Sequence, residues 1–594
     1  MIFGKQFNRY YLKYALPLLV GILTLVAVDF FQLIIPNLYQ MVINGINDGS
    51  VVVDGEAVPF DMAFLLGRIC LPFIGIILVI MVGRFVWRIA FLGSSIGVVD
   101  DLMKRMFSNA KDLSRDYYHE NKVGSLMSLF TNDLETIREC FGWGVLMFFD
   151  ALLLGVLAIT KMFRMNAMLT VLTLIPMGFL LAAATVVGKY MMDKWEVRQE
   201  AFSKLSDFSQ ESFSGIAVIK AFVKEARELW AFKRLNQNNE KANITHTKAS
   251  VLLRVLVTLF VESIICVILG YGGYLVYLGT FNAGQLVEFI GYFTAIIWPI
   301  MAVSELIDMT SRGRASLKRV SALLNEKPSV HDREGAVPIG EIKGKIEFKN
   351  LTFRFPKAHV DALTDVSFVI EPGEHVGLFG KTGAGKTTIV ELILRAYNVP
   401  DGSLFIDGVD VNSVTIRSIR DGCAFVPQDN FLFSDTIENN IAFGIDGEHD
   451  TDDVEHAAVL SAVHGNISEF EEGYKTVLGE RGVTVSGGQK QRISIARALM
   501  KDAPILILDD SVSAVDTGTE STILHNLREN RSGKTTILIA HRVSTVETMD
   551  KIIYVDDGKV TAVGTHEELL DVCPGYRNTV ELQRLEDEKG GGKL

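Results

Sequence analysis

The stretch GKTGAGKTT, residues 380–388, decides the fold of the second half of this chain. It follows the strand-like run EHVGLF and precedes the helix-like run IVELILRAY, which is the context that the pattern GxxxxGK[ST] requires. In such a loop the glycines let backbone N–H groups surround phosphate oxygens, while Lys386 reaches the β- and γ-phosphates and Thr387 can ligate Mg²⁺. The stretch therefore predicts a phosphate-binding loop between a strand and a helix of an α/β domain.

The run ILILDD, residues 505–510, supplies a partner for that loop. Four aliphatic residues that end in an acid are typical of a buried strand whose carboxyl end lies at a ligand site. Asp509 is placed to hold Mg²⁺ through water, and Asp510 takes the position of a base or of an acid that orients water. Asp510 is one methylene shorter than the glutamate that such a site most often uses, which favours ATP binding with slow turnover. The alternative is an aspartate tolerated in a compressed site.

Between these two stretches lies VSGGQKQR, residues 485–492, which resembles the LSGGQ signature of ATP-binding-cassette (ABC) proteins, with Val485 in place of leucine. The remaining family elements follow in the family's order. They are Phe355 in FRFP, similar to the aromatic that stacks on adenine; Gln428 in VPQD, at the Q-loop; Asp516 in SAVD, at the D-loop; and His541 in IAHR, at the switch histidine.

The resemblance implies that ATP and Mg²⁺ are the cofactors and assigns the site residues. The catalytic residues would be Asp510, His541 and Gln428, and Thr387, Gln428 and Asp509 would serve the metal. The nucleotide would be bound by Phe355, Gly380, Lys381, Thr382, Gly383, Ala384, Gly385, Lys386, Thr387, Thr388, Ser486, Gly487, Gly488, Gln489 and Asp516.

The first half of the chain reads as a membrane domain. Hydrophobic residues make up 49% of the sequence, and they are concentrated there in apolar stretches long enough to span a bilayer. The loops 44–60 and 279–285 contain no Lys or Arg, whereas 93–139 and 189–250 contain many, so the long segments and the two termini are expected in the cytosol of a cell whose plasma membrane holds the chain. The six predicted spans cover about 14–43, 64–92, 140–161, 165–188, 255–278 and 286–304.

This half resembles the exporter branch of the ABC superfamily. Residues 117–139 and 209–228 look like its two coupling segments, 311–328 like its exit from the last span, and LGERG at 478–482 like its X-loop. The expected fold is therefore membrane α-helical, a type I exporter or type IV ABC fold, joined to a cytosolic α/β P-loop domain. The expected divisions are an amphipathic N-terminal segment 1–13, a transmembrane domain 14–324, a linker 325–344, a nucleotide-binding domain 345–585 and a flexible tail 586–594.

One chain carries one phosphate loop and one signature, while in this family each loop faces the signature of another domain across ATP. With six spans and no internal repeat, the chain is expected to pair with a second half-transporter. Asp510 favours a heterodimer, because heterodimeric bacterial multidrug exporters carry an aspartate here in one subunit. A homodimeric exporter, an exporter-like importer of iron chelates and an ATP-gated channel or regulator remain as alternatives.

Charge and rare residues narrow the cargo and the partners. The net charge of −12 gives no reason to expect nucleic-acid binding, and the five cysteines have no metal-like spacing. Within the spans, Asp29, Asp150 and Glu262 are costly to bury and predict a cavity for cationic amphiphiles, with drugs, lipids or peptides as cargo. The alternative is that these acids pair with arginines or lie on cytosolic helix extensions; the candidate arginines are Arg84, Arg88 and Arg254.

Overall fold

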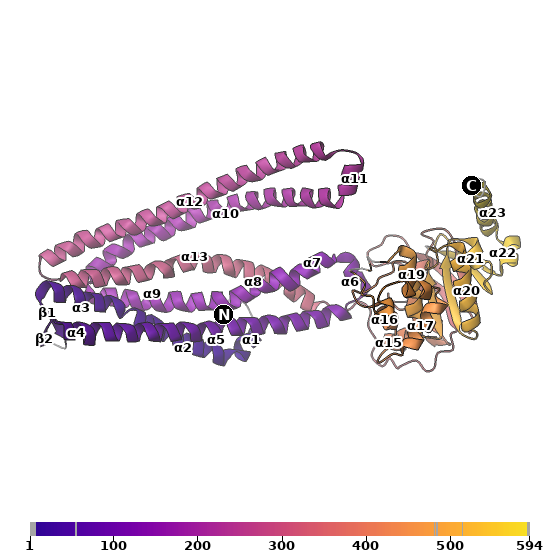
Figure 1. Cartoon of the computed structure of the whole chain (residues 1–594), viewed down its shortest axis with the longest axis horizontal. Coiled ribbons are helices and arrows are strands. Elements are labelled where there is room, and N and C mark those ends of the chain that lie inside the picture. Colours follow the sequence, from indigo (N-terminus) through magenta and orange to yellow (C-terminus); the bar gives the residue numbers. More distant parts are fainter. Residues whose placement is uncertain (1–7, 54–55, 480–481, 483–484, 514, 591–594) are drawn as a thin grey trace. The chain divides into compact units, whose positions relative to one another are not determined.

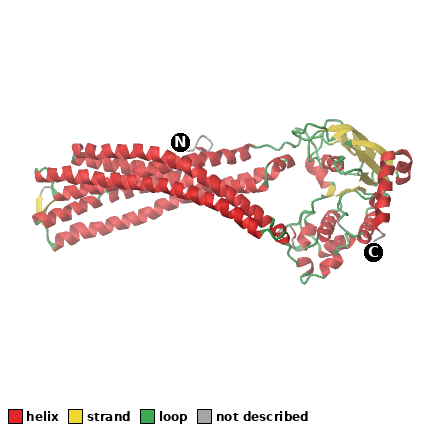
Figure 2. Cartoon of the chain, turned by 90° about the horizontal axis from the view of Figure 1, so that it is seen from above, coloured by secondary structure: helices red, strands yellow, loops and turns green. Residues whose placement is uncertain are grey.

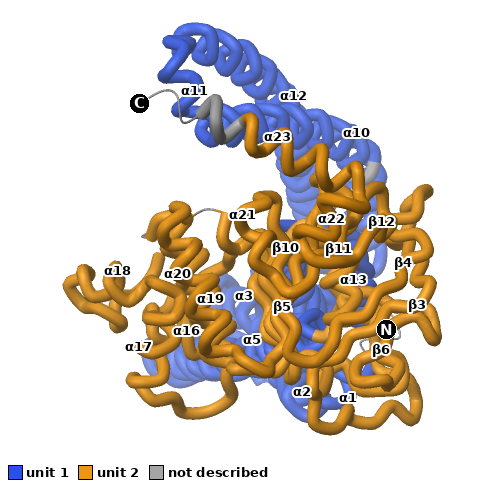
Figure 3. The backbone as a smooth tube through the Cα atoms, turned by 90° about the vertical axis from the view of Figure 1, so that its right-hand side faces the viewer, with its two compact units in different colours: residues 1–111, 124–325 blue, residues 112–123, 326–594 orange. Residues whose placement is uncertain are grey.

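The computed structural model describes residues 8–53, 56–479, 482, 485–513 and 515–590. Several expected segments therefore lie partly outside the described residues, among them 1–7 of the N-terminal segment, Glu480 and Arg481 of the X-loop, Ala514 of the SAVD motif and 591–594 of the tail. The chain divides into two compact units (Figure 3). Unit 1 comprises Met1–Lys111 and Gly124–Asn325, and unit 2 comprises Asp112–Val123 and Glu326–Leu594.

Unit 1 is built of long helices, interrupted in its described part by the short antiparallel pair β1 and β2 (Figures 1 and 2). Three of its helices exceed 42 residues because apolar spans run directly into charged helical extensions, with no helix-breaking sequence between them. The elements are α1 (Asn8–Lys13), α2 (Ala15–Gln32), α3 (Ile35–Asp48), β1 (Ser50–Val53), β2 (Glu56–Pro59), α4 (Met62–Phe64), η2 (Leu65–Cys70), α5 (Leu71–Asp112), α7 (Val123–Ser128), η3 (Leu129–Asp133), α8 (Leu134–Glu139), η4 (Cys140–Gly144), α9 (Val145–Met165), α10 (Ala167–Ser214), α11 (Ile216–Ala221), α12 (Glu225–Tyr277) and α13 (Ala283–Asn325).

Five helical stretches of the described chain are long and apolar enough to cross a membrane: Ala15–Asp48, Met62–Asp112, Val123–Met165, Glu225–Tyr277 and Ala283–Asn325. The sixth predicted span, 165–188, coincides with the first part of α10, where Ala167–Leu180 forms a shorter apolar stretch. The helical membrane fold predicted from the sequence is confirmed.

Close helix contacts in unit 1 depend on small residues, as is common where helices pack without a hydrophobic driving force. Gly83 on α5 lies against Val28 on α2, and a Cβ atom at Gly83 would come 2.5 Å from the Val28 Cγ2 atom. The helices α10 and α12 run side by side, joined by α11 (Figure 1). Phe289, Tyr292 and Phe293 of α13 are almost fully buried in the core that α9, α10 and α12 share.

Unit 2 contains the strands of an α/β domain. A six-stranded sheet has the order β12-β11-β5-β10-β9-β8, in which β11, β5, β10, β9 and β8 are parallel and β12 is antiparallel. A four-stranded antiparallel sheet has the order β4-β3-β6-β7. The strands are β3 (Ile346–Phe353), β4 (Leu363–Ile370), β5 (His375–Phe379), β6 (Leu404–Ile406), β7 (Val409–Asp410), β8 (Cys423–Val426), β9 (Ile505–Asp509), β10 (Thr535–Ala540), β11 (Lys551–Asp556) and β12 (Lys559–Gly564).

The helices of unit 2 cover these sheets and include one from the first half of the sequence. Every residue of β5 and β9 is buried, as predicted for strands of a parallel sheet that is covered on two faces. The helices are α6 (Arg115–Glu120), α14 (Lys386–Ile393), α15 (Ile416–Asp421), α16 (Ile437–Ala442), α17 (Thr451–Leu460), α18 (His464–Ser468), η5 (Gly473–Lys475), α19 (Gly487–Met500), α20 (Thr517–Asn530), α21 (Val543–Val546), α22 (His566–Val572) and α23 (Pro574–Gly590).

Helix α6 lies within the expected transmembrane domain 14–324, yet it packs with unit 2. Arg115 forms an ion pair with the buried Glu391 of α14. Glu120 forms another with Lys357, with 2.5 Å between Oε1 and Nζ. Residues of the expected linker add to this contact, because Val330 N–H donates to Ser114 Oγ at 2.9 Å. At the other end of the domain, residues 586–590 of the expected tail continue α23.

Candidate functional site

The phosphate loop connects β5 to α14 in the conformation that its glycines permit. Gly380, Gly383 and Gly385 have φ values of +155°, +83° and +101°, a region that L-residues seldom adopt. At Gly380 a Cβ atom would lie 2.0 Å from the Val555 carbonyl oxygen, so the neighbouring strand β11 leaves no room for a side chain. Helix α14 begins at Lys386, and its first N–H groups lack partners within the helix. The loop and helix end therefore form an anion-binding cradle.

Lys386 is folded back into this loop. Its Nζ atom donates to the carbonyl oxygens of Gly380 at 2.7 Å and of Lys381 at 2.8 Å, and the residue is 5% exposed. Burial lowers the pKa of Lys386, and the nearby carboxylates of Asp509 and Asp510 act in the opposite direction. The ammonium group is thus held ready at the loop, where it can reach a phosphate oxygen.

Strands β9 and β10 end at the same edge of the sheet, because β5, β10 and β9 are parallel and adjacent in that order. This edge carries Asp509 and Asp510 at the end of β9 and His541 after β10. Thr387 Oγ1 donates to Asp509 Oδ1 at 3.3 Å. Burial raises the pKa of the Asp509 carboxyl, and Asp510 adds to that rise, while the Thr387 hydrogen bond and Lys386 lower it. A hydroxyl and a carboxylate side by side are oxygen donors of the type that Mg²⁺ prefers.

Asp510 follows β9 with a left-handed backbone, φ +47°, which aspartate tolerates better than most residues. Its N–H donates to the Ile539 carbonyl at 3.0 Å, and its carbonyl accepts from Gln491 Nε2 at 3.0 Å and Ser513 Oγ at 2.9 Å. Three hydrogen bonds therefore fix the backbone of Asp510, and the one from Gln491 comes from helix α19. No hydrogen bond or ion pair among the described residues occupies its carboxylate.

One cavity of about 770 Å³ joins most of the predicted nucleotide residues. His541, which follows β10, lies in it; burial and the charge of Lys386 lower the pKa of this imidazole, opposed by Asp510. Phe355 lies at the cavity wall with its ring edge-on to Tyr397, 5.1 Å between centroids. The predicted residues that line the cavity are Phe355, Thr382, Gly383, Gly385, Lys386, Thr387, Thr388, Gln428, Asp509, Asp510 and His541.

The predicted signature and D-loop residues lie apart from this cavity's lining. Ser486 caps helix α19 through a capping box, since its hydroxyl accepts from Gln489 N–H at 3.3 Å and the Gln489 side chain accepts from Ser486 N–H at 2.9 Å. Gly487 and Gly488 are the first residues of that helix. Asp516 caps α20, and hydrogen bonds from Thr519 lower the pKa of its carboxyl.

Sequence reasoning missed the rest of the cavity wall. The hairpin between β11 and β12 turns at Asp557 and Gly558, whose φ values are +53° and +75°. Gly558 N–H donates to the Ala384 carbonyl of the phosphate loop at 3.2 Å, and the Gly558 carbonyl accepts from Thr364 N–H at 2.8 Å. The dipeptide Asp-Gly between two strand-like runs is a strong hairpin signal and could have been used. The missed lining residues are Val360, Asp361, Ala362, Thr364, Ile539, Asp557 and Gly558.

Unit 1 contains a second polar cavity, of about 610 Å³, lined by α2, α3, η4, α5, α9 and α13. Two of the three predicted acids meet there. Asp150 accepts from Trp298 Nε1 at 2.7 Å, whereas the Oδ2 atom of Asp29, 1% exposed, has no hydrogen-bond partner in the described chain. Glu262 is exposed on α12 and is not part of this lining, so the expectation that it joins the other two acids is not met.

Two arginines share this cavity with the acids. Arg84 donates to Gln32 at 3.5 Å, and the Arg88 guanidinium lies 5.4 Å from the ring centroid of Trp87. The ion pairs of the described residues join neither arginine to Asp29 or Asp150. The Nε1 atom of Trp87 also lacks a hydrogen-bond partner among the described residues, and like Oδ2 of Asp29 it is buried in the cavity wall.

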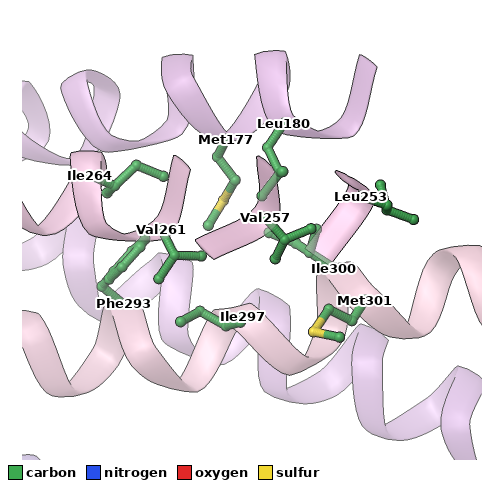
Figure 4. A pocket seen from close by; sticks show the side chains of 10 residues that line it. All are labelled: Met177, Leu180, Leu253, Val257, Val261, Ile264, Phe293, Ile297, Ile300 and Met301. Carbon is green, nitrogen blue, oxygen red and sulfur yellow. The ribbon is translucent and has the colours of Figure 1, made fainter. Parts of the chain in front are cut away.

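A smaller pocket of about 140 Å³ between α10, α12 and α13 is apolar throughout (Figure 4). Met177 points in from α10, and Val261 of α12 and Phe293 of α13 belong to the same lining. With no polar side chain in its lining, this pocket offers contact area but no group that could orient a ligand. Its lining is Met177, Leu180, Leu253, Val257, Val261, Ile264, Phe293, Ile297, Ile300 and Met301.

Comparison with known proteins agrees with this geometry. Residues 18–300 match the family model of the ABC transporter transmembrane region, and residues 363–513 match that of the ABC transporter domain. The chain is 34% identical to the probable multidrug resistance ABC transporter ATP-binding/permease protein YheI of Bacillus subtilis (strain 168), over 99% of this chain and 98% of that protein.

Two further similarities cover much of the chain. It is 34% identical to the ATP-dependent lipid A-core flippase of Syntrophus aciditrophicus (strain SB), over 84% of this chain and 83% of that protein. Its fold is similar to that of a bacterial Atm1-family ABC exporter with ATP bound, with a TM-score of 0.75, 24% identity and coverage of 97% of this chain and 98% of that structure.

Proposed function

The chain belongs to the ABC transporter family, and from this premise we propose that it is one half of a heterodimeric exporter whose own ATP site hydrolyses slowly. It is a membrane protein and an ATPase coupled to transport, since an ABC transmembrane region and an ABC ATPase domain share one chain. Its relatives include a protein named for multidrug resistance and one named a lipid flippase, which supports export of amphipathic molecules. The expected orientation, with the nucleotide-binding domain and the two termini in the cytosol, is part of this proposal.

The nucleotide cavity fits ATP and Mg²⁺ by its donors. The cradle of loop N–H groups and Lys386 would hold the phosphates, Phe355 would pack against the adenine, and Thr387 and Asp509 would hold Mg²⁺, with Gln428 beside them. The bound metal would neutralise charge on the phosphates. Asp510 would orient the attacking water, with its backbone fixed by Gln491 and Ser513.

The length of Asp510 supports slow hydrolysis at this site. A carboxylate that falls about 1 Å short of the attacking water can cost about 100-fold in rate. The backbone of Asp510 is held by hydrogen bonds to β10 and α19, so it cannot shift forward to make up the missing methylene without breaking them. This fixed short acid is the observation on which the proposal of an impaired site rests.

Exposure in unit 1 supports a second chain. Helix α11, in the second expected coupling segment, has no buried residue. Val218, Phe222 and Val223 in and beside it are 61%, 69% and 78% exposed, which is unusual for apolar residues in a segment expected in the cytosol. Helix α19 begins at Gly487 and Gly488, whose N–H groups belong to the first turn and have no acceptor within the helix, so they suit the γ-phosphate of ATP held by another domain.

For the cargo we propose a lipophilic cation bound at the cavity of Asp29 and Asp150. Asp29, which has a buried oxygen without a hydrogen-bond partner among the described residues, would supply the negative charge, and Trp87, Trp143 and Trp298 line the same cavity. Arg84 and Arg88 are directed to Gln32 and Trp87, so they do not neutralise Asp29 by direct pairing. Glu262 is exposed and is not among the residues that line this cavity, so it is left out of the proposed site.

The proposed cycle is alternating access. ATP closes the two nucleotide domains, the coupling segments transmit closure to the spans, and hydrolysis at the partner's competent site reopens them. Transport tests this in proteoliposomes that contain this chain and its partner. Uphill, vanadate-sensitive movement of a lipophilic cation such as ethidium is expected. Passive ion conductance gated by ATP would instead establish a channel.

ATPase assays test the heterodimer. The chain purified alone should hydrolyse ATP slowly, and addition of a half-transporter that has glutamate after its strand aspartate should raise the rate. Brisk hydrolysis by the chain alone, unaffected by any partner, would contradict both the impaired site and the heterodimer.

A further inference from the structure

His541, Arg542 and helix α21 (Val543–Val546), together called the switch segment, are held by the C-terminal helix α23. The side chain of Gln583 donates from Nε2 to the His541 carbonyl oxygen at 2.6 Å and accepts at Oε1 from Val543 N–H at 2.8 Å. One amide thus pairs with the backbone on both sides of Arg542, as a neighbouring strand would. Among the residues that line the nucleotide cavity, His541 is the one bonded in this way to α23.

This contact replaces a missing helix cap. Helix α21 begins at Val543, and its N-cap residue Arg542 makes no side-chain cap hydrogen bond. The Val543 N–H would otherwise remain without a partner in a buried position, at a cost of about 1–3 kcal/mol. Gln583 therefore stabilises the chain direction immediately after His541, where β10 ends and α21 begins.

Helix α23 is itself fixed to the core of unit 2. Its Tyr576 is fully buried, lies edge-on to Phe379 with 5.6 Å between ring centroids, and has its hydroxyl 2.7 Å from His566 Nδ1. Phe379 is the last residue of β5, directly before the phosphate loop. The same helix therefore contacts the strand that ends at the phosphate loop and the segment that carries His541.

A second side chain holds the opposite end of the switch segment. Glu520 on α20 accepts from Arg542 Nη1 at 3.3 Å and from the Thr545 hydroxyl. Gln583 therefore bonds the backbone of His541, and Glu520 bonds the side chains of Arg542 and Thr545 that follow it. The His541 side chain lines the nucleotide cavity near Lys386 and Asp510.

We propose that Gln583 is a positioning residue for ATP recognition, which acts by holding His541 against the γ-phosphate. Lys386 reaches the β- and γ-phosphates, and His541 lies in the same cavity, so the imidazole is suited to contact the terminal phosphate that ADP lacks. Gln583 itself is not among the residues that line the nucleotide cavity. Its loss should therefore weaken binding of ATP and leave binding of ADP unchanged.

The test compares the two nucleotides on the full chain in nanodiscs with Mg²⁺, by titration with ATPγS and with ADP. Gln583→Met keeps the length of the side chain and removes both hydrogen bonds, and should weaken ATPγS binding about tenfold, with ADP affinity within about twofold. Gln583→Glu keeps the acceptor for Val543 N–H but loses the donor to His541, and should fall between Gln583→Met and the unchanged chain. Glu581→Gln, at an exposed position of the same helix, is the matched control and should change neither affinity.

Two results would overturn the proposal. If Gln583→Met lowers the affinities for ATPγS and ADP equally, the variant has lost structure in general. If its affinity for ATPγS is undiminished, the hydrogen bonds of Gln583 have no role in recognition. Because binding is measured without turnover, these outcomes are independent of whether Asp510 impairs hydrolysis or of which cargo is exported.

Discussion

The nucleotide cavity of unit 2 and the cavity of Asp29 and Asp150 in unit 1 differ in how their charged groups are held. In the nucleotide cavity, Lys386 donates to two loop carbonyls, Asp509 accepts from Thr387, and the backbone of Asp510 makes three hydrogen bonds. In the membrane cavity, Asp29 has an oxygen and Trp87 has an N–H without partners among the described residues. The first cavity is arranged in advance for one ligand and one reaction. The second keeps two buried polar atoms unpaired in its wall, and under the proposed function these are groups that a cargo could satisfy once the side chains move.

The largest loss of activity is expected from a substitution in the nucleotide cavity. Lys386→Ala removes the ammonium group and leaves the carbonyls of Gly380 and Lys381 without their donor. ATP hydrolysis at this chain's own site should fall by about 10²–10³. The measurement is ATPase activity and photolabelling of this chain with an ATP analogue. Retained labelling at the level of the unchanged chain would show that Lys386 is not essential to the cradle.

Asp510→Glu tests whether the carboxylate of this site is one methylene too short to reach the attacking water. Turnover at this site should rise by up to about 100-fold, since the carboxylate would reach the attacking water. The readout is ATPase activity of the complex whose partner site is inactivated by glutamine at its glutamate. Asp510→Asn is the control and should not raise the rate. No gain with glutamate would mean that something other than length limits the site.

Asp29→Asn tests whether the cavity of Asp29 and Asp150 binds a cation. Removing the charge should lower the transport of a lipophilic cation by about tenfold, the size expected for a hydrogen bond to a charged group, with basal ATPase activity unchanged. Glu262→Gln is the matched control, because Glu262 is an exposed acid on α12 outside the cavity. Equal effects of the two variants would argue against a cation site at Asp29.

Trp298→Phe tests whether the hydrogen bond from Trp298 to Asp150 contributes to binding of the cation. It removes the donor to Asp150 Oδ2 and keeps an aromatic wall. A loss of about threefold to tenfold in apparent affinity for the cation is expected, from one hydrogen bond of about 1 kcal/mol. Concentration series of transport measure it, and an unchanged half-saturation concentration would place Trp298 outside cargo binding.

The smallest effect is a pH dependence of stability in unit 2. Burial lowers the pKa of His375 from its ordinary value of 6.5, assisted by Arg528 and Arg531 and opposed by Asp550. The unfolded chain then binds more protons than the folded one as pH falls below 6.5, so stability is present above that value and is lost towards acid. The melting temperature should fall by a few degrees between pH 7.5 and 5.5, and His375→Gln should reduce that fall. An equal fall in the variant would assign the dependence to other groups.

Local pattern predicted the parts of the fold that depend on neighbouring residues. The strand, glycine loop and helix over 375–393 form as expected, because glycines at 380, 383 and 385 fix the turn and the flanking runs have clear periodicity. The apolar stretches predicted the membrane helices for the same reason. The hairpin at Asp557 and Gly558 had a local signal that was overlooked.

Contacts between distant residues could not be predicted in this way. Hydropathy marks Asp29 and Glu262 alike, and packing alone decides that Asp29 is buried in a cavity while Glu262 is exposed. The pairing of Gln583 with His541 joins residues 42 apart, and that of Arg115 with Glu391 joins residues 276 apart. No periodicity records such contacts, since they depend on how whole elements are arranged.

The exposed apolar surface at α11 has a consequence for the life of the protein in a cell. If the proposed second half-transporter covers Val218, Phe222 and Val223, a newly made copy without it displays the kind of surface that chaperones and proteases recognise. Under that proposal we expect the steady-state amount of this chain to follow the synthesis of its partner, because copies without a partner would be degraded. Deleting the partner's gene should shorten the half-life of this chain, measured by pulse-chase, without any change in its messenger RNA.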